Sequence, residues 1–430
     1  MLQLYRNPDI NEWGTLLERP VMDIGSLENT VVSILKEVKE NGDSSLKKYA
    51  LLFDKTNLNS LVVTKQEITE AEKSISKDLK IAIGIAKKNI EKFHASQKEK
   101  IKIIETSKGV KCWRKSVPIE KIGLYIPGGS APLFSTILML GVPAKLAGCK
   151  EIILCTPPQS NEKINAAILY TAKLVGINKI FKVGGAQAIA AMAFGTESIP
   201  KVHKIFGPGN QYVTCAKQLV QKNGVCIDMP AGPSEVALLA DSSCVPSFVA
   251  ADLLSQAEHG IDSQVILVSD SEKTITQVLE ELLIQLEQLP RKEIAIKSLK
   301  KSKAILVKNK QEAIKLLNEY APEHLILSCK NANAISKQIT NAGSVFIGNY
   351  SPESAGDYAS GTNHTLPTNG YAKAYSGVSL DGFVKKITFQ ELSKEGLQKL
   401  GKAVEIMAEA EGLFAHKNAI AIRIKKEFKK

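Results

Sequence analysis

The chain has 430 residues, of which 44% are hydrophobic and 23% charged, which is a globular composition. That length exceeds what one ordinary hydrophobic core fills, so we expect about two to four structural units. The net charge of +12 is spread over lysine-rich segments that also contain glutamate, which indicates solvated surfaces and argues against a dedicated nucleic-acid patch.

The sequence shows neither the pattern of a targeting signal nor the cysteine spacing of a thiolate metal site. The first 20 residues contain no apolar run of the kind that a secretory signal needs, and no window reaches the roughly 18 apolar residues of a membrane span. The 7 cysteines are scattered, and none forms a CxxC pair. This usage suits a reducing compartment and argues against a thiolate zinc site, so we expect a cytoplasmic protein.

The first quarter of the chain has the period of helices. Residues 26–97 repeat apolar positions at helical spacing, and Ser26 is the expected N-terminal cap. The alternation between residues 101 and 118 then predicts a β-hairpin that turns at Lys108 and Gly109.

From Gly123 the pattern changes to short apolar strands, each followed by a turn rich in glycine or proline. Helical stretches follow four of these turns, beginning near Ser135, Asn161, Ala186 and Gln211. Repeated strand-turn-helix units predict a mainly parallel sheet whose ligand edge lies at the carboxyl ends of the strands. A domain of the nucleotide-binding type is therefore expected here.

A second α/β series occupies residues 235–347, and its strands could pair with the opening helical layer. In residues 348–377 the only aliphatic side chain larger than alanine is Leu366, which predicts a long loop that closes over a site. A short strand follows, and then amphipathic helices over residues 389–430. These helices are too small to hold a core alone, so they should lean on another domain or subunit.

Two glycine-rich turns lie between a predicted strand and a predicted helix, GGAQA from residue 184 and GPGN from residue 207. Small residues at such a turn let a phosphate approach the free N–H groups of the helix. Neither turn matches GxGxxG. A phosphate site and a plain tight turn are equally good interpretations of these residues.

Gln256 and His259 are three residues apart near the end of a predicted helix, which puts them on one face. Together with Asp357 and a further histidine they would make a nitrogen and oxygen site suited to zinc or manganese. A single Gln-x-x-His pair is also common on protein surfaces, so both interpretations stay open.

Two further positions could carry chemistry. Glu323 and His324 follow Pro322 at the start of a predicted strand, where a carboxylate and an imidazole at one cleft could transfer protons. A solvent-exposed pair is the alternative. Cys155, at the end of another strand, is either a nucleophile for aldehyde oxidation or a small buried core residue.

Seven motifs occur along the chain in the order GLYIPGG, VGGAQAIAAMAFGT, IFGPGNQYVTCAK, DMPAGPSEV, QAEHG, YAPEHL and SPESAGDYASGTNHTLPT. In this order, across residues 20–420, they resemble the histidinol dehydrogenase family. The resemblance implies an enzyme that oxidises L-histidinol to L-histidine through L-histidinaldehyde, the last steps of histidine biosynthesis. It also implies two NAD per reaction and one zinc ion, Zn²⁺, per active site.

The resemblance implies the following site residues, motif by motif. The metal ligands would be Gln256, His259, Asp357 and His416. The catalytic acid–base pair would be Glu323 and His324. The NAD contacts would be Tyr125, Gln187 and Asn210. The substrate contacts would be Ser234, Gln256, His259, His324, Asp357, Glu411 and His416, with His364 and Ser135 as further contacts.

The fold class implied is α/β, with two incomplete Rossmann-like domains, small N- and C-terminal helical pieces, and an intertwined homodimer. NAD would be bound without GxGxxG, and the C-terminal helices would cross to complete the partner's active site. The implied parts are an N-terminal arm at 1–20, a first α/β domain at 21–122 and 235–378 with the metal and acid–base residues, a Rossmann-like NAD-binding domain at 123–234, and a C-terminal dimerisation piece at 379–430.

Two other classes of protein fit parts of the sequence. A zinc metallohydrolase acting on a nucleotide-like substrate would share the metal residues, but it gives no reason for Tyr125, Gln187 and Asn210. A basic RNA-binding or scaffold protein would bind RNA in a salt-sensitive manner, with no dependence on metal.

Overall fold

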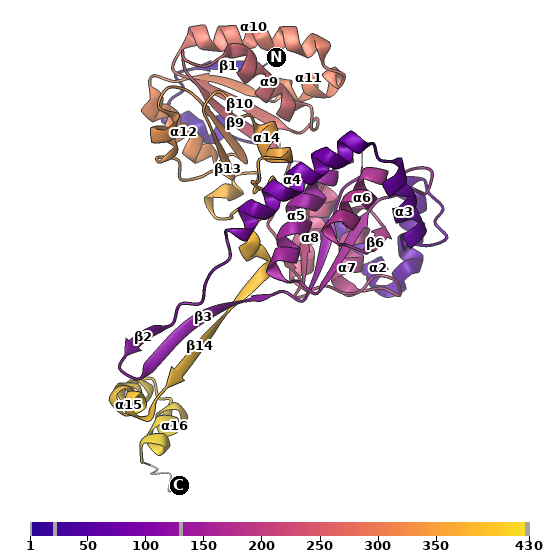
Figure 1. Ribbon diagram of the computed structural model, residues 1–430. Coiled ribbons are helices and arrows are strands. Elements are labelled where there is room, and N and C mark those ends of the chain that lie inside the picture. The colour runs from indigo at the N-terminus through magenta and orange to yellow at the C-terminus, as the bar shows by residue number, and fades with distance from the viewer. Residues whose placement is uncertain (1, 20–23, 129–131, 426–430) are drawn as a thin grey trace. The chain divides into compact units, whose positions relative to one another are not determined.

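The computed structural model describes residues 2–19, 24–128 and 132–425 (Figure 1). The expected boundary between residues 20 and 21 and the last glycine of GLYIPGG lie outside the described residues. The chain divides into two compact units. The first consists of Met1–Gln97 and Ile119–Phe383, and the second of Lys98–Pro118 and Val384–Lys430.

The first unit contains a five-stranded parallel sheet with the order β6-β5-β4-β7-β8. Its strands are β4 (Lys121–Tyr125), β5 (Glu151–Thr156), β6 (Lys179–Lys182), β7 (Lys204–Phe206) and β8 (Cys226–Ile227). The intervening helices are α5 (Phe134–Ala147), α6 (Ala166–Val175), α7 (Gly185–Phe194) and α8 (Gln211–Gln221). The predicted strand-turn-helix series is confirmed. The strand order reverses on either side of β4, which creates a crevice at the carboxyl edge of the sheet.

The opening helices pack on this five-stranded sheet. They are α2 (Ile24–Asp54), α3 (Lys65–Ser74) and α4 (Lys77–Ala95). Helix α2 contacts α7 and α8, α3 contacts α6, and α4 contacts α5. The expected domain that groups residues 21–122 with residues 235–378 therefore does not describe these helices. Their apolar faces complete the two hydrophobic cores around the five-stranded sheet of residues 121–227. Helix α2 begins at Ile24, so Ser26 lies inside the helix and is not its cap.

A six-stranded parallel sheet completes the first unit, with the order β1-β11-β10-β9-β12-β13. Its strands are β1 (Gln3–Arg6), β9 (Glu235–Ala240), β10 (Gln264–Ser269), β11 (Lys303–Leu306), β12 (His324–Ser328) and β13 (Ser344–Ile347). Its helices are α9 (Pro246–Ala257), α10 (Glu272–Gln288), α11 (Lys292–Lys300), α12 (Lys310–Tyr320) and α13 (Ala332–Ser336). The second α/β series is thus confirmed.

The N-terminal segment is part of this six-stranded sheet. Strand β1 pairs in parallel with β11 of the same chain. The short elements η1 (Ile10–Glu12) and α1 (Trp13–Leu16) follow, and Trp13 and Leu16 are buried in the core beneath the sheet. A four-residue edge strand with half-buried side chains leaves too little apolar periodicity to be identified from sequence.

The second unit is built on the predicted hairpin, which is confirmed. Strands β2 (Ile104–Ser107) and β3 (Val110–Pro118) are antiparallel, and β14 (Val384–Leu392) pairs with the other edge of β3. Helices α15 (Lys394–Ala410) and α16 (Phe414–Lys425) pack on each other at the end of this sheet.

The stretch 348–377 is not the structureless loop that its composition predicts. It contains α14 (Glu353–Tyr358) and the 3₁₀ turn η2 (Tyr371–Lys373), and η3 (Leu380–Phe383) follows it. Polar side chains and small residues hide α14 from any search for apolar periodicity. Across the described part of the chain, no helix is long and apolar enough to cross a membrane.

Candidate active site

Glu323 and His324 lie where β12 begins, at the amino edge of the six-stranded sheet. Both side chains are buried, with exposed fractions of 5% and 4%. The backbone of Glu235, at the start of the neighbouring strand β9, holds both of them. Its N–H donates to Glu323 Oε2 at 2.9 Å, and its carbonyl oxygen lies 3.2 Å from His324 Nδ1. The solvent-exposed alternative for this pair is therefore wrong.

Helix α14 brings two carboxylates to the same imidazole. Glu353 Oε1 lies 3.6 Å from His324 Nδ1, and Asp357 Oδ1 lies 3.5 Å from His324 Nε2. The two acids are four residues apart, which places them on one face of the short helix. One ligand atom from each of the three residues falls within 4.8 Å of the others, a spacing that could hold a metal ion.

Several polar atoms at this cluster are buried without a hydrogen-bond partner among the described residues. They are Gln256 Oε1 and Nε2, His324 Nε2, Glu353 Oε2 and Asp357 Oδ1. Gln256 is fully buried on α9, a helix that packs against α14. A buried amide with neither group bonded carries a desolvation cost, which a bound cation would offset. The residues present therefore fit a divalent metal ion.

The remaining expected metal ligands, His259 and His416, are exposed. His259 lies in the turn just after α9, its side chain is exposed, and the charges of Asp357 and His324 act on it. His416 and the expected substrate contact Glu411 belong to the second unit, where both are exposed. The first unit brings together Gln256, His324 and Asp357 without them.

The burial of this cluster shifts its proton equilibria. Burial raises the pKa of Glu323 to about 8, although His324 acts in the opposite direction. The same cause raises the pKa of Glu353 to about 8. Burial lowers the pKa of His324, but the surrounding carboxylates outweigh it and raise this pKa well above its usual value. The two carboxyl groups can therefore exchange protons near neutral pH, and a bound cation would favour their ionised forms.

A small cavity of about 40 Å³ adjoins Glu323. Its walls include Glu323 together with Ser234 and His364, two of the expected substrate contacts. His364 Nδ1 donates to the Asp357 carbonyl oxygen at 2.8 Å, so its Nε2 accepts from the Thr136 hydroxyl at 3.0 Å. Ser135 is buried beside Thr136 on α5.

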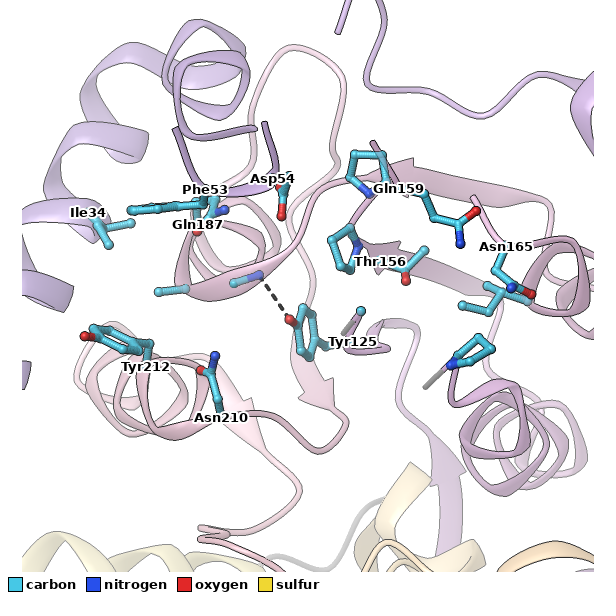
Figure 2. A pocket seen from close by; sticks show the side chains of 17 residues that line it. Ile34, Phe53, Asp54, Tyr125, Thr156, Gln159, Asn165, Gln187, Asn210 and Tyr212 are labelled. Atoms are coloured by element: carbon cyan, nitrogen blue, oxygen red, sulfur yellow. Dashed lines mark hydrogen bonds between the residues drawn. The ribbon is translucent and has the colours of Figure 1, made fainter. Parts of the chain in front are cut away.

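The three expected NAD contacts line one larger cavity of about 670 Å³ (Figure 2). It lies at the carboxyl edge of the five-stranded sheet, where Tyr125 ends β4. The Gly185 N–H donates to the Tyr125 hydroxyl at 3.0 Å, and Gln187 is buried on α7. Asn210 caps α8 by accepting from the Val213 N–H at 3.1 Å.

The GPGN turn owes part of its composition to backbone packing. Gly207 has φ +132°, and a Cβ there would lie 2.0 Å from the Tyr125 carbonyl oxygen. Its N–H donates to Asp228 Oδ2 at 2.8 Å. The tight-turn interpretation therefore accounts for Gly207, while Asn210 of the same turn faces the cavity.

Cys155 is fully buried in the core of the five-stranded sheet. Burial raises the pKa of its thiol far above the usual range, which disfavours the thiolate. The interpretation of Cys155 as a small core residue is confirmed.

Sequence reasoning missed two residues of this site. Glu353 could have been found from its four-residue spacing to Asp357, if the loop had been expected to contain a helical turn. Glu235 acts through its backbone, and no sequence pattern identifies such a role.

The comparisons with known proteins cover nearly the whole chain and point to one family. The family model described as histidinol dehydrogenase matches residues 17–424. Histidinol dehydrogenase of Bacteroides fragilis is 60% identical over 423 residues, covering 98% of this chain and 99% of that protein. The Escherichia coli enzyme is 52% identical over 412 residues, covering 95% and 94%. A crystal structure of histidinol dehydrogenase from Elizabethkingia anophelis has a TM-score of 0.97 at 58% identity, covering 99% of this chain and 98% of that one. The chain therefore belongs to the histidinol dehydrogenase family.

Proposed function

We propose that this protein oxidises L-histidinol to L-histidine through L-histidinaldehyde, with two NAD as acceptors and one zinc ion per active site. The reaction ends histidine biosynthesis. The observation that carries the proposal is that the proposed proton acceptor His324 is buried beside Asp357, near the buried and unpartnered amide of Gln256, in a chain of this family.

Gln256, His259 and Asp357 would hold the zinc ion, together with His416 of the partner subunit. Bound zinc would orient the substrate through its amino and imidazole nitrogens, and bound NAD would accept hydride. The unpartnered buried oxygen atoms of Gln256 and Asp357 support this assignment.

The protein's own residues would move the protons. His324 in its neutral form takes the hydroxyl proton of histidinol as the carbon is oxidised to the aldehyde, and a cation bound beside the surrounding carboxylates would favour that form. Glu323 then takes a proton from water as the water oxygen adds to the aldehyde carbon, and His324 returns its proton to the carbonyl oxygen, which gives the hydrate and leaves His324 neutral for the second oxidation. His324 takes a hydroxyl proton of the hydrate in the second oxidation, which yields the carboxylate of histidine. The raised pKa of Glu323, about 8, suits a group that exchanges protons near neutral pH.

Substrate would be held by Ser234 and His364 at the small cavity, by Ser135, and by Glu411 of the partner subunit. His364 uses both ring nitrogens on Thr136 and Asp357, so its contribution is to shape this wall. The larger cavity, lined by Tyr125, Gln187 and Asn210, would bind NAD. Residues 123–234, with the opening helices packed on them, would then form the NAD-binding domain.

We further propose that the protein is an intertwined homodimer. Two of the assigned residues, Glu411 and His416, lie on the helical piece of the second unit and are exposed. Exposed apolar side chains on the same piece, Ile406, Met407, Leu413 and Phe414, support burial against another chain.

The test is an assay of the zinc-loaded protein with L-histidinol and NAD, followed by NADH absorbance. We expect two NADH for each histidinol consumed and L-histidine as the product. Removal of zinc by a chelator should abolish turnover, and added zinc should restore it. Folded protein that contains zinc and forms no NADH would refute the proposal.

A further inference from the structure

The larger cavity contains one charged side chain among its described lining residues, the carboxylate of Asp54. Asp54 is the last residue of helix α2. Its Oδ2 atom is buried and has no hydrogen-bond partner in the described part of the chain. No lysine or arginine lines the cavity there to balance its charge. A buried carboxylate without donors is costly, so its place in a ligand cavity calls for a ligand that supplies them.

The position of Asp54 relative to the sheet indicates which donors these are. In the usual dinucleotide site an acidic residue near the end of the second strand binds the hydroxyls of the adenosine ribose. Here the second strand, β5, ends in the sequence TPPQ, which has no acid. Asp54, on a helix outside the sheet, lines the same cavity as this segment. The Thr56 hydroxyl contacts both the Asp54 carbonyl oxygen, at 2.9 Å, and the Gln159 carbonyl oxygen, at 3.4 Å.

Two further observations place the carboxyl group in the cavity. Figure 2 shows Asp54 on the side of the cavity opposite Asn210, with its carboxyl group toward Tyr125. Its negative charge is felt by the Tyr125 hydroxyl, whose pKa burial and that charge together raise to about 12. The segment that follows α2 is joined to β6 by two backbone hydrogen bonds. The Val63 N–H donates to the Ile180 carbonyl oxygen at 3.0 Å, and the Lys182 N–H donates to the Leu61 carbonyl oxygen at 2.7 Å.

We propose that Asp54 binds the 2′- and 3′-hydroxyls of the adenosine ribose of NAD and excludes NADP. The inference rests on the proposed function only in taking this cavity as the dinucleotide site. Two ribose hydroxyls donate to the carboxylate oxygens. A 2′-phosphate removes one donor and places further negative charge against a carboxylate, with no described basic side chain in the cavity to pair with it.

Calorimetric binding to the zinc-loaded protein tests the proposal without turnover. The ligands are NAD, NADP and an NAD analogue that lacks the adenosine 2′-hydroxyl. Hydrogen bonds to a charged group correspond to about a 10- to 100-fold change in Kd. We expect the wild-type protein to lose about that factor with the deoxy analogue, and more with NADP. Asp54→Ala should bind NAD and the deoxy analogue with similar Kd values, and Asp54→Asn should narrow the gap between NAD and NADP.

Glu40→Gln is the matched control, because Glu40 lies on the same helix with a side chain that is 58% exposed. It should bind all three ligands as the wild type does. Wild-type protein that binds NAD and the deoxy analogue equally would overturn the proposal, and that measurement needs no variant. An Asp54→Ala variant that binds NAD as tightly as wild type would overturn it too. Failure of the proposed function would be distinguishable from failure of this proposal, because the protein would then form no NADH from histidinol.

Discussion

The guanidinium of Arg19 and the carboxylate of Glu235 form a buried two-bond ion pair, with Nε 2.6 Å from Oε1 and Nη2 2.8 Å from Oε2. Arg19 also donates to the Tyr320 carbonyl oxygen at 2.7 Å and lies 4.0 Å from the centre of the Tyr320 ring. Glu235 contacts Glu323 and His324 through its backbone. The N-terminal segment is thereby tied to β9, whose Glu235 backbone contacts Glu323 and His324, and to α12, the helix that precedes β12.

Replacement of Arg19 should therefore damage both stability and turnover. Arg19→Ala leaves the Glu235 carboxylate buried without its counter-charge, which should lower the free energy of unfolding by about 3–5 kcal/mol. Looser positioning of Glu323 and His324 should lower kcat about 10- to 100-fold in the protein that remains folded. Denaturant unfolding and steady-state kinetics measure the two effects.

Arg6→Ala provides the control for the Arg19 prediction. Arg6 is in the same N-terminal segment and pairs with Glu272, but both side chains are about half exposed. An exposed pair contributes at most about 1 kcal/mol, so this variant should keep near wild-type stability and kcat. Equal effects of the two substitutions would contradict the role given to Arg19.

Single substitutions should distinguish the residue proposed to bind zinc from the residue proposed to accept protons. His259→Asn should lower the zinc content, because it removes a proposed ligand. His324→Asn should retain zinc and lose turnover, because it removes the proposed proton acceptor while leaving Gln256 and Asp357 in place. Elemental analysis of the purified variants, with NADH formation measured on the same samples, checks both. Full turnover in His324→Asn would refute its role.

The sequence predicted the positions of side chains such as Glu323 and His324 better than it predicted contacts made by packing or by backbone atoms. The acid–base pair was expected at the start of a strand and is found there, because proline and an apolar strand mark the position locally. The partner of the opening helices was not predictable. Amphipathic periodicity shows that Val31 and Leu35 need a buried surface, but it does not show that α7 supplies it.

The stretch 348–377 illustrates the same limit at the site. Its composition predicted that it contributes to a site, and Asp357 of this stretch lies in the buried cluster. It did not indicate the single helical turn that places Glu353 beside Asp357, because neither residue is apolar and a six-residue helix has too few positions to show a period. Asp54 was likewise missed, since one acid at the end of a helix carries no motif.

The proposed exchange of C-terminal pieces can be tested by mixing subunits. His416→Asn and His324→Asn chains should each be inactive as homodimers. If His416 serves the partner's site, a mixed dimer has one site that carries both substitutions and one intact site. Mixed dimers should therefore recover up to about half of the wild-type activity per dimer. Differently tagged chains, purified as mixed dimers after exchange, measure this. Mixed dimers that stay inactive would count against the crossing.

The environment of Asp54 predicts that Asp54→Asn stabilises the ligand-free protein but weakens the binding of NAD. Burial raises the pKa of this carboxyl group from 3.8 to about 6, so the folded protein disfavours its ionised form. The resulting loss of stability is absent below pH 3.8, grows as the pH rises toward 6, and stays constant above that. Asp54→Asn should therefore raise the Tm of the ligand-free protein at pH 7.5, and the difference from wild type should shrink as the pH falls below 6.

Thermal melts across this pH range, with and without saturating NAD, measure the effect. NAD should raise the Tm of the wild type more than that of Asp54→Asn, because the ligand binds the wild type more tightly. A purely structural carboxylate would give the reverse pattern, a variant that is less stable at pH 7.5 and gains as much from NAD as the wild type does. That result would show that Asp54 serves the fold and not the ligand.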